Sequence, residues 1–205
     1  MHKTIRPAFV AVSFALICVA SSVSAEEAIR LRGTIDRMEG SAFVVRNRDG
    51  AEVKMVTTEK PQYIGMFKSE ISDIKLGQFI GSTAMPQPDG TQKASEVHIF
   101  PESMRGLGEG HYEWDLRPKS TMTNANIEQS VAGVDGPVLS VKYKGGEKKL
   151  LVTPQTIVVT FYPGDKAELK PGTKIWAGPT LTKQADGTLL AALVIYGRDG
   201  VEPPF

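Results

Sequence analysis

The residues best suited to chemistry gather in one stretch of the sequence, HIFPESMRGLGEGHYEWDLRPKSTMTNA, residues 98–125. It holds both histidines that follow residue 25, together with several carboxylates and methionines. Imidazole with carboxylate suits zinc, copper or nickel, and an added thioether favours Cu(I). The two histidines are thirteen residues apart and form neither HxH nor HExxH. A metal site here would therefore be assembled by folding, and its candidate ligands are His98, His111, Glu102, Glu113 and Met104.

The same stretch offers a second kind of site, one that binds a small molecule. Aromatic and apolar residues alternate with carboxylates in HYEWDL, which predicts either a strip packed on a barrel or a platform on which a ligand ring stacks. An arginine nearby could pair with these carboxylates or bind an anion. The candidate ligand-binding residues are His98, Arg105, His111, Tyr112 and Trp114. The alternative is purely structural, with one histidine hydrogen-bonded in a covered strand and the other in a polar loop.

Motifs of known enzyme classes are missing from the sequence. It contains no GxSxG elbow, no SxxK and no nucleophile beside an evident base. The glycine run GLGEG is not followed by an apolar helix or by Gly-Lys-Ser/Thr, as a phosphate-binding loop would require. The glycines are better explained as a tight turn in a connecting segment. We therefore expect a protein that is not an enzyme and has no cofactor, unless copper or zinc binds.

The amino-terminal segment predicts export. Lys3 and Arg6 precede the apolar run AFVAVSFALICVA, and SSVSA follows, which is the layout of a signal peptide cleaved after Ala25. The apolar run is shorter than the roughly 20 residues that cross a bilayer. Cleavage would remove Cys18, and no later run is long enough to span a membrane. The expected location is the periplasm or the medium.

The charge balance excludes a general nucleic-acid-binding protein. Two of the 24 basic residues lie in the predicted signal peptide, which leaves 22 against 23 acidic residues. A nucleic-acid binder would show a strongly basic surface. The expected partner is an unknown small molecule or another protein of the cell envelope.

An internal repeat organises the rest of the chain. Residues 33–100 resemble residues 131–198, and the matched positions within them lie 95 to 97 residues apart, with DIKLG (73–77) opposite ELKPG (168–172). The segment PDGTQKASEVHIF aligns with ADGTLLAALVIYG, which puts Ile195 at the position of His98. Repeats of this length indicate duplicated structural units. The expected division is a signal peptide at 1–25, a first repeat at 26–100, a connector at 101–126 and a second repeat at 127–205.

Each copy predicts a small β-barrel. The turn sequences Asp-Gly at 49–50, 89–90 and 186–187, and Gly-Gly at 145–146, lie between runs that alternate apolar and polar residues. This combination is a strong hairpin signal. Several short strands with regularly spaced turns favour a barrel or sandwich. We expect an all-β protein of two tandem OB-like barrels. The connector carries many apolar residues and two prolines, so we expect it to be ordered against them.

The repeat also resembles a known family. The pattern GTIDRMEGSAFVVRNRDG…DIKLGQFIG…PDGTQKASEVHIF is similar to the small OB-like domains grouped as domain of unknown function 5666, found in exported bacterial proteins. The second copy resembles the same domain. The connector resembles a segment of exported bacterial proteins often named automatically as metal ABC transporter permease, a name at odds with the single apolar run here. The resemblance implies a fold and supplies no catalytic residues.

Three functions remain open from the sequence. The first, which we favour, is an exported, non-catalytic binding module. The second is an envelope metal-binding protein for copper or zinc that uses the region of His98 and His111. The third is a structural or assembly role, in which a barrel edge pairs with a partner strand.

Overall fold

The protein is described from a computed structural model, which covers residues 29–205. The predicted signal peptide, residues 1–25, lies outside the described residues. The prediction of an all-β protein is confirmed: residues 29–205 form twelve strands and three short 3-10 helices, η1 (Ile71–Asp73), η2 (Glu102–Met104) and η3 (Lys166–Glu168). No helix in this part of the chain is long and apolar enough to cross a membrane.

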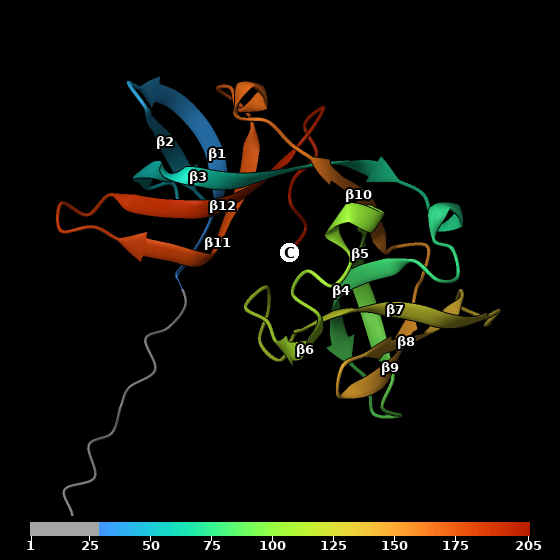
Figure 1. Ribbon diagram of the computed structural model, residues 1–205. Coiled ribbons are helices and arrows are strands. Elements are labelled where there is room, and N and C mark those ends of the chain that lie inside the picture. Colours follow the sequence, from blue (N-terminus) through green and yellow to red (C-terminus); the bar gives the residue numbers. More distant parts are fainter. Residues whose placement is uncertain (1–28) are drawn as a thin grey trace, which may run out of the picture.

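Five strands close into a barrel, which we call the first barrel (Figure 1). They are β1 (Ile29–Glu39), β2 (Ala42–Asn47), β3 (Glu52–Ser69), β11 (Lys174–Lys183) and β12 (Leu189–Gly197). β1 pairs antiparallel with β2 and with β11, β2 pairs with β3, and β11 pairs with β12. A parallel pairing of β12 with β3 closes the barrel. Closure leaves no free edge among these strands.

The same order of pairings recurs in a second group of strands, which we call the second ring. Its members are β4 (Phe79–Pro86), β5 (Gln92–Ile99), β7 (Thr121–Val131), β8 (Val138–Tyr143) and β9 (Gly146–Leu151). β7 pairs antiparallel with β4 and β8, β8 with β9, and β4 with β5. A short parallel contact between β5 and β9 completes the ring.

Two further strands tie the molecule together. β10 (Ile157–Pro163) runs antiparallel to the last part of β3 and parallel to β5, so it joins the first barrel to the second ring. β6 (Gly110–Glu113) pairs antiparallel with β7, opposite residues 121–124. The segment expected as a connector thus contributes a strand of its own, and its last residues begin β7.

Each ring takes strands from both copies of the repeat. The first barrel combines β1–β3 with β11 and β12, and the second ring combines β7–β9 with β4 and β5. Figure 1 shows this directly, because blue and red strands lie side by side in the first barrel. The strand pairing therefore crosses the division expected at 101–126. Each copy supplies three strands to one ring and two to the other.

Equivalent turns in the two copies show the same exchange in their hydrogen bonds. Gly77 N donates to Ile127 O at 3.0 Å, whereas Gly172 N donates to Ile35 O at 2.7 Å. Both glycines have positive φ, +78° and +89°, which other residues adopt only at a cost. The motif Leu/Ile-Lys-x-Gly of each copy is thus seated on the first strand of the other copy.

The predicted hairpin turns are confirmed. Asp49-Gly50 joins β2 to β3, Asp89-Gly90 joins β4 to β5, and Asp186-Gly187 joins β11 to β12. In the last two turns the aspartate accepts a hydrogen bond from the backbone N–H two residues on. These hydrogen bonds lie within each turn, which explains why the Asp-Gly sequence alone predicts its position.

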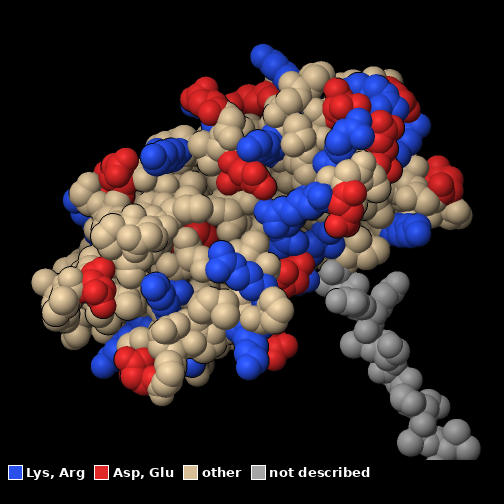
Figure 2. Space-filling view, turned by 180° about the vertical axis from the view of Figure 1, so that it is seen from behind, with Lys and Arg blue, Asp and Glu red and all other residues tan. Residues whose placement is uncertain are grey.

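Three clusters of buried side chains form the core. One fills the first barrel around Ile35 and Met55, and one fills the second ring around Ile80 and Leu150. The third lies between the two rings and is rich in aromatic residues. On the face shown in Figure 2, acidic and basic side chains are interspersed over the surface. The third cluster borders a cavity that lies between the two rings.

Candidate functional site

A cavity of about 470 Å³ lies between the first barrel and the second ring. Its volume is within the range of small-molecule sites. Strands from both rings contribute to its wall, and so does the carboxy-terminal residue, which lies between the rings in Figure 1. The aromatic part of the lining consists of Phe100, Tyr112, Trp114, Phe161, Trp176 and Phe205.

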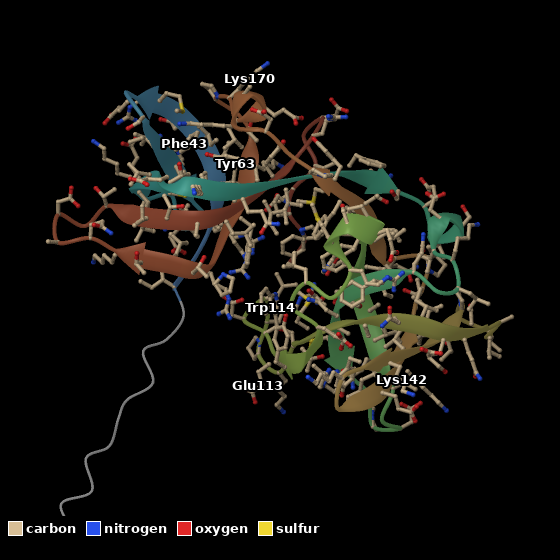
Figure 3. All side chains as sticks on the ribbon, in the orientation of Figure 1. Phe43, Tyr63, Glu113, Trp114, Lys142 and Lys170 are labelled. Carbon is tan, nitrogen blue, oxygen red and sulfur yellow. The ribbon has the colours of Figure 1, made fainter. Side chains whose placement is uncertain are left out.

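The aromatic rings of the lining contact one another in a continuous series. His98 stacks on Phe161, with centroids 4.7 Å apart and ring planes 18° apart, and its ring lies 5.3 Å from that of Phe205. Phe205 in turn packs edge-on against Trp176 at 5.6 Å, and Trp176 lies 6.0 Å from Trp114. Figure 3 shows Trp114 in the space between the two groups of strands. This wall favours an apolar or aromatic ligand.

Four buried side-chain nitrogen and oxygen atoms within residues 29–205 have no hydrogen-bond partner in the protein: Arg30 Nε, Trp114 Nε1, Trp176 Nε1 and Asn124 Oδ1. All four residues line the cavity. A buried polar group without a partner costs about 1–3 kcal/mol. Three N–H donors and one acceptor are therefore left for something other than the protein to bind.

His98 is held from behind by a buried carboxylate. Glu96 has no exposed surface, and its carboxylate oxygens lie 3.0 and 3.2 Å from His98 Nδ1. Thr83 donates to the same carboxylate from its backbone nitrogen and from its hydroxyl. A carboxylate only accepts, so the hydrogen lies on Nδ1 and is donated to Glu96. Glu96 thus fixes the orientation of a cavity-lining imidazole.

Asn124 lies on β7, on the other side of β4 from His98. Its amide nitrogen donates to Leu107 O at 3.3 Å and Gly108 O at 3.0 Å, so its oxygen is the atom left without a donor. Its neighbour on β4 is Gly81, and a Cβ added there would collide with both His98 Nε2 and Asn124 Oδ1. The glycine is what lets these two polar atoms approach the strand.

Arg30 lies near a second arginine, Arg32, and a single carboxylate, that of Asp115. Its guanidinium sits 4.7 Å from the centre of the Trp114 ring, and its Nη1 is 3.6 Å from Asp115 Oδ2. Asp115 is already bonded by both Nη atoms of Arg32, at 2.9 and 2.7 Å. Burial alone would raise the pKa of Asp115, but the bonds from Arg32 and the two positive charges outweigh it and lower the pKa. Two arginines therefore share one carboxylate.

Three of the five candidate binding residues reach the cavity: His98, Tyr112 and Trp114. Tyr112 is 39 % exposed. The pKa of its hydroxyl is raised by burial, an effect that Arg30 partly offsets. The other two candidates do not line the cavity. The Arg105 guanidinium is occupied by Glu102, Asn126 and the carbonyl of Gly77.

His111 also lies away from the cavity. Its Nδ1 is 2.8 Å from the hydroxyl of Thr123, and its ring stacks on Tyr143. Partial burial lowers the pKa of its imidazole, and the charge of Lys148 lowers it further. Both effects favour the neutral imidazole, which packs on Tyr143 and does not line the cavity.

The candidate metal ligands are not brought together. His98 bonds to Glu96, His111 bonds to Thr123, and Glu102 pairs with Arg105. Among residues 29–205, no three histidine or acidic side chains lie close enough to share a metal ion. The sequence suggested this cluster because the residues are close along the chain, whereas β6 and η2 direct them to different partners.

Sequence reasoning missed Arg30, Trp176 and Asn124. Arg30 and Trp176 line the same cavity because β11 of the second copy pairs with β1 of the first, where Trp176 is opposite Arg32. One signal was present in the aligned repeats, which put Trp176 at the position of Gly81. A glycine in one copy and a tryptophan at the equivalent position of the other indicate that the two positions have different surroundings in the folded protein.

Comparison with known protein families, with curated proteins and with solved structures gives no match. The site must therefore be interpreted from its own geometry.

Proposed function

We propose that the protein is an exported, non-catalytic binding protein that holds a small, largely apolar molecule in the cavity between its rings. One observation carries the proposal: all four buried side-chain polar atoms without a partner in residues 29–205 belong to residues that line this cavity. Folded proteins satisfy nearly all such groups, so four around one cavity are better explained by a ligand than by chance. The signal-peptide pattern of residues 1–25 supports a location in the periplasm or the medium.

We propose also that the fold consists of two OB-like units of the kind grouped as domain of unknown function 5666, with strands exchanged between the copies. The order of pairings, in which the third and fifth strands of each ring are parallel, supports this assignment. OB-like barrels commonly bind ligands on a strand face and its flanking loops. The metal-binding and assembly functions have no contact within residues 29–205 that favours them over ligand binding.

The two tryptophans of the protein provide the test, because both line the cavity. The uncharged fluorescent probe N-phenyl-1-naphthylamine should bind with a stoichiometry of one and change the tryptophan emission. Ala192→Phe fills part of the cavity and should abolish this binding. Ala132→Phe, at an exposed position in the turn before β8, is the matched control and should bind as the wild type does.

Two results would overturn the proposal. The first is an unchanged tryptophan emission across the titration. The second is equal binding by Ala192→Phe and the wild type, which would place the probe elsewhere. Circular dichroism of both variants shows whether each has kept the wild-type fold.

A further inference from the structure

Arg30 is the one lining residue with a charged side chain, and the lining contains no aspartate or glutamate. Its guanidinium forms an ion pair with Asp115 at 3.6 Å but makes no hydrogen bond within residues 29–205, because both oxygens of Asp115 are bonded by Arg32. Arg32 also donates to the backbone oxygen of Phe205, another residue of the lining. Glu96 lies behind the imidazole of His98 and is satisfied by three donors. The Arg30 guanidinium is therefore the positive group of the lining whose hydrogen-bond donors are left over.

The unpartnered donors belong to neighbouring side chains. The Arg30 guanidinium covers the ring of Trp114, and Trp114 lies 6.0 Å from Trp176. Each of the three has a buried N–H without an acceptor. A carboxylate only accepts hydrogen bonds and can accept several at once, so it suits a cavity whose unpartnered groups are mostly donors. Hydrogen bonds between ionised groups are also about twice as strong as those between neutral groups.

The rest of the wall selects the body of the ligand. Beyond the donors the lining is largely apolar and includes a cluster of rings: His98 stacks on Phe161, Phe161 packs edge-on against Phe205, and His98 and Phe205 are tilted to each other. Such surfaces bind planar rings well, because ring pairs add attraction to the burial of apolar area. A flexible or strongly polar ligand would leave these rings without matching contacts.

We infer that the ligand is a planar aromatic carboxylate, whose anionic group accepts hydrogen bonds from Arg30, Trp114 and Trp176 while its ring packs on the aromatic wall. This inference rests on the proposed function and adds the charge and shape of the ligand. It makes Arg30 the residue that sets specificity for an anion. Asn124 Oδ1 remains available for a hydroxyl or N–H group elsewhere on the same molecule.

Three compounds with one ring system test the inference by isothermal titration calorimetry at pH 7: 2-naphthoate, 2-naphthamide and 2-naphthylmethylammonium. Naphthoate should bind at least about tenfold more tightly than the amide, and the ammonium compound most weakly. Arg30→Met keeps a long apolar side chain and should reduce the ratio of naphthoate to amide affinity to near one. The matched control is Arg48→Met, at an exposed arginine in the β2–β3 turn, which should keep the wild-type ratio.

Trp114→Phe is the second variant, and it keeps the proposal testable if Arg30→Met does not fold. It preserves an aromatic face for Arg30 but removes one N–H, so the ratio should fall several-fold. Equal affinity of the wild type for naphthoate and amide would overturn the inference, as would a ratio in Arg30→Met or Trp114→Phe equal to that of the wild type. If N-phenyl-1-naphthylamine binds in the cavity while naphthoate shows no preference, only this inference fails. If neither binds, the proposed function fails as well.

Discussion

Removal of the Glu96 carboxylate should destabilise the protein strongly. The carboxylate is fully buried and accepts from Thr83 N at 3.0 Å, from Thr83 Oγ1 at 3.1 Å and from His98 Nδ1 at 3.0 Å. Glu96→Ala leaves these three groups buried without a partner. Each such group costs about 1–3 kcal/mol. We expect the free energy of unfolding to fall by about 3–5 kcal/mol.

Glu96→Gln separates the charge of this side chain from its shape. The amide oxygen can still accept from Thr83, whereas the negative charge facing His98 is lost. The expected loss is about 1–2 kcal/mol, the worth of a charge-assisted hydrogen bond. Urea unfolding at pH 7, followed by far-ultraviolet circular dichroism, measures both variants. Glu128→Gln, at an exposed position of β7, is the control and should change stability by less than about 0.5 kcal/mol.

The second copy of the repeat supplies a further variant. Leu193 and Ile195 occupy the positions of Glu96 and His98 there. The double change Glu96→Leu with His98→Ile removes both polar partners, so it should cost less than Glu96→Ala alone. The reasoning is refuted if Glu96→Ala unfolds at the urea concentration of the wild type, or if Glu96→Gln is as unstable as Glu96→Ala.

Three other predictions concern the first barrel, the cavity and the exchanged strands. Tyr196→Phe removes the hydroxyl that donates to Glu168 at 2.6 Å and should cost about 1–2 kcal/mol in urea unfolding. That bond is the main cause of the lowered pKa of Glu168, so the stability it adds is complete above about pH 4.5 and is lost as pH falls through the lowered pKa. A Tyr196→Phe protein with an undiminished loss of stability in acid would contradict this. Gly81→Ala brings a Cβ against His98 Nε2 and Asn124 Oδ1. It should lower both the urea midpoint of unfolding and the affinity for N-phenyl-1-naphthylamine. Unchanged values of both would show that these two atoms can move aside. Trypsin cleavage after the exposed Lys119 should give two fragments that elute together in gel filtration, because each ring needs strands from both, and separate elution would disprove the pairing.

The local structure was predictable from the sequence, whereas the pairing between copies was not. Asp-Gly turns and alternating strands depend on a few adjacent residues, so they can be read directly. The choice of partner cannot, because β4 and β11 derive from equivalent segments and offer similar patterns to β1 and β7. Strand register is set by the buried face, and that face is apolar in both copies. The sequence of one copy therefore does not show whether its five strands form a ring by themselves or share a ring with strands of the other copy.

The candidate site was predictable to the same limited extent. His98, Tyr112 and Trp114 stood out because an imidazole and aromatic rings lay close together in one segment. His111 and Arg105 stood out for the same reason, but their neighbours on β7 and η2 satisfy them away from the cavity. Arg30 and Trp176 are far apart along the chain. They line the same cavity because of the exchange of strands.

The exchange of strands also governs the order in which the chain can fold. When the first hundred residues have been synthesised, β3 and β5 exist, but their parallel partners β12 and β9 do not. The second ring cannot close until β9 is present, and the first barrel cannot close until β12 is present, so only local pairings such as β1–β2–β3 and β4–β5 can form early. Pairings this distant in sequence slow folding, and open strand edges invite association with other chains. The first copy must therefore avoid association with other chains until the second copy has been synthesised.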